Sequence, residues 1–353
     1  MKIDNLRKEI DSIDARILDL LNRRGTKALD IARLKSAEGR RYYVPEREKY
    51  IISRLLGKNR GPITEEGLKI IYREILSVCR SLGAPIRVAY LGPEGSFSHI
   101  AATEKFGSSI ELMPAANIAH VFVQVEKNEV ELGVAPVENS SEGVVTYTMD
   151  MLVDSPLKIV NEIILEVTYY LVSREKDTKS VKKVYVHPQA FGQSRVWMRN
   201  NMPGVKVVEV DSNSEAARLA SLEKKSAAIT SKWAAEIYDL NILRSHIEDL
   251  AHNYTRFIVV SKENARRTGR DKTSVIFSLR HRPGALYHCL SVFSKSNINL
   301  TKIESRPSKK KAWDYIFFID LEGHADDKKV RRALGSFEKL CVYMKVLGSY
   351  PRE

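Results

Sequence analysis

The sequence has 353 residues, 43% of them hydrophobic, and a formal net charge of +13. At about 100 to 200 residues a domain, this length predicts two or three domains with buried cores. No apolar run approaches the ~18 residues of a membrane helix and the N-terminus lacks a signal-peptide core, so we expect a cytoplasmic protein without a membrane partner. The positive charge is spread along the chain without a nucleic-acid motif, which favours small anionic ligands over nucleic acid.

Sequence motifs for metals and cofactors are absent. Cys79, Cys289 and Cys341 lie far apart without metal-ligand spacing, which predicts reduced thiols rather than disulfides or a zinc site. The histidines are scattered, and no glycine motif for phosphates or dinucleotides occurs. We therefore expect neither a metal nor a cofactor.

The N-terminal segment predicts a helix too long to be covered by its own chain. Apolar residues from Ile3 to Leu34 recur at intervals of three and four, the pattern of a coiled-coil seam. A helix that runs to about Ala37 would be ~50 Å long at 1.5 Å per residue. The next predicted helices, Pro45–Leu56 and Thr64–Leu82, are shorter. We expect a partner chain to complete the bundle.

Arg24 interrupts the apolar seam at a position where a leucine would be expected. A charge there needs an anion. Lys35 lies only ~20° around the helix from Arg24 and ~16 Å along it, so the two side chains can bracket one small ligand. Arg7 is ~42 Å from Lys35 along the same helix and can reach that ligand only from a second subunit. The alternative, charges that extend from a bundle surface into water, stays open from these residues alone.

A first family resemblance rests on four stretches: Leu6–Asp11, Leu20–Arg24, Lys35 and Pro45–Glu48. Together they resemble the all-helical chorismate mutases, intertwined dimers that rearrange chorismate to prephenate, and this implies such a domain at residues 1–84. The resemblance implies that the substrate carboxylates are held by Arg24, Arg47 and the partner subunit's Arg7. It also implies that Lys35 donates to the breaking ether oxygen and that Glu48 accepts the ring hydroxyl. The rearrangement needs a compact pose and cations, not a cofactor.

Two positions depart from that family. Val44 stands where some members have an aspartate, and Gly83 where they have a glutamine or glutamate that bonds the ether oxygen. A glycine there, followed by Pro85, is also a sound helix stop. The resemblance therefore implies one fewer hydrogen bond to the substrate.

Beyond Pro85, strand-like and helix-like runs alternate, and polar residues stand at the ends of four of the predicted strands. These polar stretches are Gly92–His99, Glu138–Gly143, His187–Gln193 and the pair Thr255-Arg256 before the buried run Phe257–Val260. Ligands bind at strand ends in sheets with helices on both faces, where an arginine can fix a carboxylate and a hydroxyl can act on it. We expect the chain to cross to a second lobe near Ile159–Glu166. Each stretch alone is ordinary turn or helix-cap chemistry.

The order of four segments carries a second resemblance: Ala89–His99, Pro136–Ser140, His187–Ala190 and Thr255–Phe257. Across residues 85–263 they resemble the prephenate dehydratases, two α/β lobes around a cleft, which convert prephenate to phenylpyruvate with loss of carbon dioxide and hydroxide. The resemblance implies that Thr255 bonds or protonates the leaving hydroxyl and that Arg256 holds the pyruvyl carboxylate. It also implies that Glu138, Asn139 and Gln193 orient the ring or tune the proton donor.

Substrate binding is assigned by the same resemblance to Ser96, Phe97, Ser98, His187 and Gln189. The serines precede a predicted helix, whose first N–H groups can bind an anion or can simply be capped. This segment also departs from its family. Val186 replaces a usual serine, Tyr254 a frequent threonine and Thr230 a frequent small residue. Loss of the serine hydroxyl removes one polar contact, which implies a weakened site or an altered substrate preference.

Residues 273–350 follow a polar linker and predict a ferredoxin-like β-α-β-β-α-β order. The predicted strands are Ser274–Leu279, Asn299–Glu304, Trp313–Leu321 and Val342–Leu347, and the helices are Arg282–Lys295 and Asp326–Leu340. Two stretches resemble the ACT regulatory domain, which binds phenylalanine between subunits. The implied effector residues are Gly284, Ala285, Leu286, Glu304, Ser305 and Arg306, with Tyr287 in place of a common valine. The alternative is a purely structural dimerisation module.

The whole chain thus resembles the bifunctional chorismate mutase/prephenate dehydratases of phenylalanine biosynthesis. The expected fold is a multidomain one: an all-α domain, a two-lobed α/β domain and a ferredoxin-like α+β domain. The resemblance implies a homodimer or higher homo-oligomer that is inhibited by phenylalanine. Three alternatives remain: an arogenate dehydratase, a phenylalanine-responsive binding protein with weakened catalytic sites and, more distantly, a nucleic-acid binder.

Overall fold

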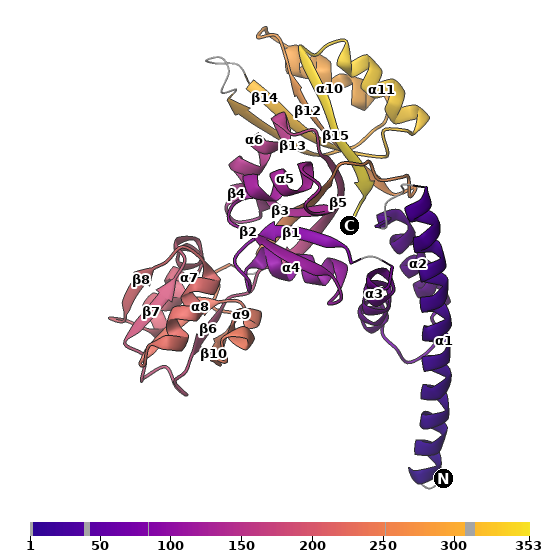
Figure 1. The fold of residues 1–353 in the computed structure, drawn as a ribbon. Coiled ribbons are helices and arrows are strands. Elements are labelled where there is room, and N and C mark those ends of the chain that lie inside the picture. The colour runs from indigo at the N-terminus through magenta and orange to yellow at the C-terminus, as the bar shows by residue number, and fades with distance from the viewer. Residues whose placement is uncertain (1–2, 39–42, 84, 251, 308–314) are drawn as a thin grey trace. The chain divides into compact units, whose positions relative to one another are not determined.

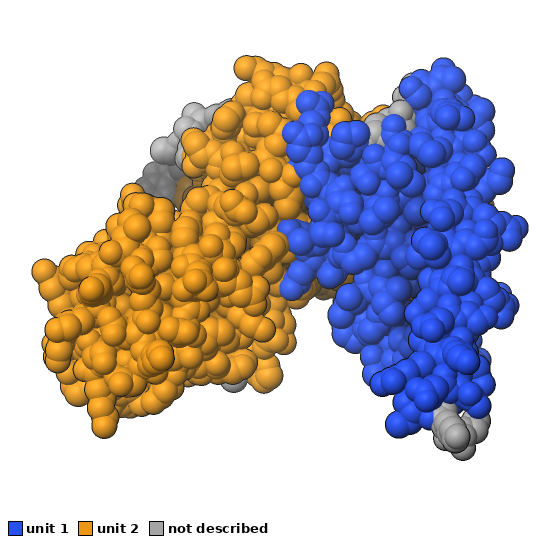
Figure 2. All heavy atoms as spheres, turned by 60° about the horizontal axis from the view of Figure 1, so that its bottom comes forward, with its two compact units in different colours: residues 1–87, 103–111 blue, residues 88–102, 112–353 orange. Residues whose placement is uncertain are grey.

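The computed structural model describes residues 3–38, 43–83, 85–250, 252–307 and 315–353. The chain divides into two compact units: residues 1–87 with 103–111, and residues 88–102 with 112–353 (Figure 2). Among the described residues, we find no helix whose length and hydropathy suit a membrane span. Trp313, with which one predicted strand begins, lies outside the described residues.

The N-terminal unit is built on three helices: α1 (Ile3–Ala37), α2 (Pro45–Lys58) and α3 (Glu65–Ser81) (Figure 1). All three were predicted, and the long helix ends at the expected residue. Pro45 opens α2, where its fixed φ suits the first helical turn. Thr64 caps α3 by accepting a hydrogen bond from the Gly67 N–H.

The apolar seam of α1 is not covered by its own chain. Ile10 is 55% exposed, Ile13 52% and Ile17 48%. Leu20 and Leu34 of the same helix are also exposed. Folding of a single chain therefore leaves a continuous apolar stripe in water, an arrangement that soluble monomers rarely keep.

The second unit begins with a six-stranded mixed sheet in the order β2-β1-β3-β11-β5, with β4 beside β3. Its strands are β1 (Arg87–Leu91), β2 (Glu111–Ala115), β3 (Leu132–Asn139), β4 (Gly143–Val144), β5 (Lys158–Glu166) and β11 (Tyr254–Ser261). Its helices are α5 (Ile118–Glu126), α6 (Thr146–Asp154) and the first part of α4 (Phe97–Phe106), whose residues 103–106 belong to the N-terminal unit. The predicted buried run Phe257–Val260 is confirmed: it lies in β11, which pairs with β3 on one side and β5 on the other.

A second sheet forms the other lobe, in the order β10-β6-β9-β7-β8. Its strands are β6 (Tyr170–Ser173), β7 (Lys183–Val186), β8 (Lys206–Glu209), β9 (Ser226–Thr230) and β10 (Asn241–Ser245), and its helices are α7 (Pro188–Asn201), α8 (Asn213–Leu222) and α9 (Lys232–Ile237). The crossing to this lobe comes slightly later than expected. All of β5 pairs with β11 in the first sheet, so the chain crosses only after Glu166.

The C-terminal segment forms a four-stranded antiparallel sheet in the order β13-β14-β12-β15. Its elements are β12 (Asp271–Ser278), α10 (Ala285–Lys295), β13 (Leu300–Pro307), β14 (Tyr315–Glu322), α11 (Lys328–Glu338) and β15 (Tyr343–Pro351). This is the predicted β-α-β-β-α-β order. Side chains such as Phe277, Phe293 and Phe337 form one core between the sheet and its two helices.

The other face of this sheet packs on the first lobe through close backbone contact. A Cβ atom added at Gly348 of β15 would lie 2.1 Å from the Ile159 carbonyl oxygen of β5. No side chain fits in that space. Gly348 therefore permits the C-terminal sheet to approach the first lobe.

Gly348→Ala should separate the two sheets and destabilise the second unit. Overpacking of this kind costs about 1–3 kcal/mol, and the melting temperature should fall by several degrees. The control is Gly335→Ala in α11, where an added Cβ meets nothing within 4 Å. That change should be neutral or stabilising by up to ~1 kcal/mol. Thermal unfolding followed by circular dichroism compares them, and equal melting temperatures would contradict the close approach.

Candidate functional sites

A pocket of about 250 Å³ opens among the three N-terminal helices. Its charged lining is Arg24, Lys27, Lys35, Arg47, Glu48 and Arg80. Four residues predicted to act together, Arg24 and Lys35 of α1 with Arg47 and Glu48 of α2, thus line one pocket. Cations outnumber carboxylates in this lining, which suits a small anion.

Arg7 is not part of this pocket lining. It lies near the start of α1, is 73% exposed and forms an ion pair with Asp4 at 3.7 Å. Arg7 and Lys35 lie near opposite ends of α1, too far apart along the helix to contact one small ligand. The requirement for a second subunit therefore stays a prediction.

Arg80 of α3 is a pocket residue that the sequence reasoning missed. It is only 9% exposed and donates hydrogen bonds to the Glu48 carboxylate and to the Phe106 carbonyl oxygen. Its guanidinium lies 5.9 Å from the ring centroid of Tyr43. A signal was available, because Arg80 follows the buried Leu76 by one helical turn. The same kind of signal, a charge on a buried helix position, had singled out Arg24.

The two departures from the family pattern both lie at this pocket or beside it, and one has a packing explanation. Val44 lines the pocket just before α2. A Cβ atom at Gly83 would lie 2.4 Å from the Ala32 Cβ of α1. A longer side chain at position 83 would therefore require α1 to move.

A chain of hydrogen bonds joins predicted residues from the two lobes of the second unit. The Asn139 amide, at the end of β3, donates to the Thr255 hydroxyl over 2.9 Å and to the Asn253 side-chain oxygen over 2.8 Å. Asn253 in turn donates to the Gln193 side-chain oxygen of α7 over 2.7 Å. Thr255, Asn139 and Gln193 therefore lie together, as predicted. Asn253 was missed as a site residue, although it directly precedes the Tyr254-Thr255 pair.

Ser96, just before α4, makes hydrogen bonds that hold the start of this helix. The Ser96 hydroxyl donates to the Leu91 carbonyl over 2.9 Å and accepts from the His99 N–H at 3.3 Å. Ser98 is buried, and Phe97 packs edge-on against Tyr169 of the second lobe. The capping alternative therefore describes Ser96 in this structure.

The imidazole of His99 is an additional feature of that helix. It stacks between Tyr90 and Trp233 and accepts the Gly95 N–H at Nδ1 over 3.0 Å. Burial lowers the pKa of His99, which keeps the ring neutral and able to accept that bond. The turn before α4 is thereby held in place.

The predicted His187 and Gln189 lie at the start of α7. His187 occupies the N-cap position without a side-chain capping bond, and burial lowers its pKa. Gln189 is exposed. Val186 is fully buried in the core of the second lobe, where its side chain packs without a polar partner.

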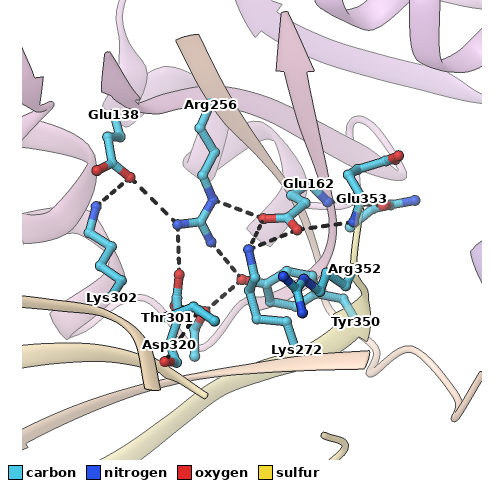
Figure 3. Close-up of polar contacts among 12 residues, drawn as sticks. Glu138, Glu162, Arg256, Lys272, Thr301, Lys302, Asp320, Tyr350, Arg352 and Glu353 are labelled. Atoms are coloured by element: carbon cyan, nitrogen blue, oxygen red, sulfur yellow. Dashed lines mark hydrogen bonds and ion pairs between the residues drawn. The ribbon is translucent and has the colours of Figure 1, made fainter. Parts of the chain in front are cut away.

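Glu138 and Arg256 lie on the opposite face of the sheet from Thr255. Neighbouring strand residues alternate between faces, so the pairs Thr255 with Asn139 and Arg256 with Glu138 point to different sides. The Arg256 guanidinium donates to Glu162 of β5 over 2.9 Å and lies 2.7 Å from Asp320 of β14 (Figure 3). The sequence predicted that both residues act beside Thr255, but in this structure they lie on the other face of the sheet. The prediction did not take the alternation of side chains into account.

The charges around Arg256 compensate for its burial. Burial by itself would lower the pKa of Arg256, but Tyr350, Asp320 and Glu162 raise it. Glu162 is only 1% exposed and also pairs with Lys272 at 2.7 Å. The guanidinium therefore stays charged inside a network of opposite charge.

A smaller pocket of about 140 Å³ lies in the C-terminal sheet at the start of α10. The predicted effector residues Ala285 and Leu286 line it, and Gly284 precedes them with a φ of +76°. The predicted Glu304, Ser305 and Arg306 lie on β13 and are not among its lining residues. Arg306 instead pairs with Asp150 of α6 at 2.7 Å.

Three family profiles match the chain in series: Chorismate mutase type II at residues 6–83, Prephenate dehydratase at residues 88–265 and ACT domain at residues 273–338. A bifunctional chorismate mutase/prephenate dehydratase from Aquifex aeolicus (strain VF5) is 47% identical over 99% of this chain and 98% of its own length. The chain belongs to this bifunctional family. Another member, from Stutzerimonas stutzeri, is 42% identical over 98% of this chain and 97% of its own length.

Solved structures agree with this assignment for the second unit. A prephenate dehydratase from Arthrobacter aurescens, determined in complex with L-Phe, is similar with a TM-score of 0.70 and 33% identity over 76% of this chain and 90% of that one. The chain is therefore a multidomain enzyme with a helical chorismate mutase domain, a two-lobed prephenate dehydratase domain and an ACT domain. The predicted family and fold class are confirmed.

Arg80→Gln should weaken the chorismate mutase domain selectively. The change removes the positive partner of Glu48 and one cation of the pocket, and loss of a single charge-stabilising group costs roughly tenfold or more in kcat/KM. Arg54→Gln is the matched control, because Arg54 is exposed on α2 and is not among the pocket's lining residues. Chorismate consumption at steady state measures both, and equal rates would contradict a role for Arg80.

Proposed function

We propose that this chain rearranges chorismate to prephenate in the α1–α3 pocket and converts prephenate to phenylpyruvate at the Thr255–Asn139–Gln193 cluster. The observation that carries the proposal is the convergence of residues distant in sequence on two separate polar sites. Each site lies within the segment that matches the corresponding family. The proposed domains are residues 1–84, 85–263 and 273–350.

The rearrangement needs no proton transfer and no covalent intermediate, so positioning and positive charge suffice. Arg24 and Arg47 bind the carboxylates of chorismate, with the partner subunit's Arg7 completing the pocket. Lys35 donates to the ether oxygen as its bond to the ring breaks. Glu48, held by Arg80, accepts the ring hydroxyl. The pocket volume of about 250 Å³ is compatible with one small dianion.

The dehydratase step breaks a carbon–carbon bond to release carbon dioxide and a carbon–oxygen bond to release hydroxide. The electron pair from the carboxylate bond enters the ring, which becomes aromatic as the hydroxyl leaves. Thr255 donates a hydrogen bond or a proton to that hydroxyl, which departs as water. Asn139 orients this donor by a direct hydrogen bond to the Thr255 hydroxyl, and Gln193 is linked to Asn139 through Asn253.

Phenylalanine is the proposed feedback effector, bound at the ACT pocket beside Ala285 and Leu286. Support comes from the similar Arthrobacter protein, which was determined in complex with L-Phe. The proposed assembly is a homodimer or a higher homo-oligomer, because the apolar seam of α1 needs a partner. The cytoplasmic location stays a prediction.

Two closer alternatives concern the catalytic sites. One is a preference for arogenate over prephenate, which a comparison of both substrates at equal concentration would reveal. The other is a phenylalanine-binding protein with weak catalysis, suggested by Gly83 and Val186. Both residues have packing explanations, against Ala32 and in the second-lobe core. Catalysis is therefore the better-supported function.

A coupled assay tests the whole proposal. Purified protein receives chorismate, and prephenate and phenylpyruvate are followed separately with and without phenylalanine. Phenylpyruvate formation that phenylalanine suppresses is the expected result. Accumulation of prephenate alone would remove the dehydratase assignment, and phenylalanine binding without any turnover would favour the binding-protein alternative.

Thr255→Ala should lower dehydratase turnover by about 10²-fold or more, because it removes the proposed proton donor. Chorismate consumption should stay nearly unchanged, since the mutase pocket lies in a different domain. Thr255→Ser keeps a hydroxyl and should retain part of the activity. A parallel loss of both reactions in Thr255→Ala would argue against two separate sites.

Mixed dimers test the shared mutase site. Arg7→Ala and Lys35→Ala homodimers should each be inactive as mutases, because every site loses one required cation. After subunit exchange, hybrid dimers should regain activity, since one of their two sites then contains both native residues. Rates are measured before and after mixing, with exchange verified by differently tagged chains. Absence of recovery despite exchange would refute the shared site.

A further inference from the structure

On strands β3 and β11 of the dehydratase domain, one face carries the proposed catalytic residues and the other face carries a pair of charged residues. The register of β3 and β11 pairs Thr255 with Asn139 and Arg256 with Glu138. Thr255 and Asn139 bond each other on the face of the proposed dehydratase site. Glu138 and Arg256 point to the other face, because side chains alternate along a strand.

Residues of the ACT domain hold both charged side chains on that second face (Figure 3). Arg256 Nη1 lies 2.7 Å from Asp320 Oδ2, and Nη2 donates to the Tyr350 hydroxyl over 2.9 Å. Lys302 Nζ lies 2.6 Å from Glu138 Oε2. Arg256 is 12% exposed and Asp320 is 8% exposed, so water and salt screen this pair weakly. Glu138 is 36% exposed, so its pair with Lys302 is screened more.

Among the described residues, these contacts enclose only a small cavity. The cavity lined by Arg256, Lys302 and Asp320 measures about 20 Å³, enough for roughly one water molecule. The close backbone approach of Gly348 to Ile159 lies at the same interface. The two domains are thus joined directly, side chain to side chain and backbone to backbone.

One of the ACT strands that hold this network, β14, also lines the proposed effector pocket. Tyr315 and Phe317 of β14 line that pocket, and Asp320 lies further along the same strand. Lys302 lies on β13, which pairs with β14 along most of its length. A shift of either strand on effector binding would move the charged partner of Arg256 or Glu138.

We propose that Asp320 and Lys302 are positioning residues for the dehydratase site, and that an effector in the ACT pocket acts on Thr255 and Asn139 through them. Neither residue touches the substrate. Asp320 holds β11 through Arg256, and Lys302 holds β3 through Glu138. The inference rests on the proposed dehydratase reaction and its inhibition by phenylalanine, and it adds the route between the two sites.

Lys302→Met tests this route against a matched substitution, Lys345→Met. Lys345 of β15 also docks the ACT domain, by donating to the carbonyl oxygens of Leu152, Val153 and Ser155 at the end of α6. It contacts neither β3 nor β11 through these bonds. The pair of variants therefore separates the proposed route from docking in general.

The readout is the ratio of dehydratase rates without and with saturating phenylalanine. In Lys302→Met this ratio should fall about fivefold or more, the lower end of ordinary coupling between sites, whereas phenylalanine binding by calorimetry should stay within about threefold. Lys345→Met should keep the native ratio. Lys302→Arg, which retains the charge, should restore it.

Asp320→Asn provides a second variant on the Arg256 side, and it should also lose inhibition while binding phenylalanine. Retained binding reports a folded ACT domain in each variant. Full inhibition in both Lys302→Met and Asp320→Asn would overturn the proposal, as would an equal loss in Lys345→Met. Failure of the proposed function itself would be seen in the unmutated protein. That protein would then form no phenylpyruvate, or its dehydratase rate would not change when phenylalanine is added.

Discussion

The alternation of side chains along β11 is the constraint on which the dehydratase half of this enzyme depends. Thr255 and Arg256 are neighbours in sequence, yet a strand must send them to opposite faces. One face receives Asn139 and, through Asn253, Gln193 of the second lobe. The other face receives Glu162 and the ACT domain. A single strand thereby serves both a polar cluster at the lobes and an interface with the ACT domain.

The helical domain meets a different constraint, which is the close packing of its helices. Gly83 comes so near to Ala32 that a side chain there has no space. Arg80, nearly one helical turn earlier, instead brings a charged group to the same pocket and holds Glu48. Arg80 thus adds a polar group from a position that helix packing leaves open to the lining that the family resemblance implied.

Local sequence signals predicted most of the secondary structure. The α1 seam, the buried run of β11 and the C-terminal β-α-β-β-α-β order all follow from periodicity and breaker residues, which act over a few positions. The family resemblance singled out Thr255, Asn139 and Gln193, whose side chains lie in one hydrogen-bonded chain through Asn253. Periodicity does not reveal long-range partners, so the ion pairs of Arg256 with residues some 60 to 95 positions away were missed.

The sequence by itself thus determined the family and the order of its three domains, since each depends on short stretches in order. Only the tertiary structure decided which face those residues occupy. Arg256 and Glu138 belong to the ACT interface because Asp320, Tyr350 and Lys302 lie across from them. A buried charge is stable only beside an opposite charge. Which residue supplies that opposite charge depends on how the sheets pack, and no local sequence pattern encodes this packing.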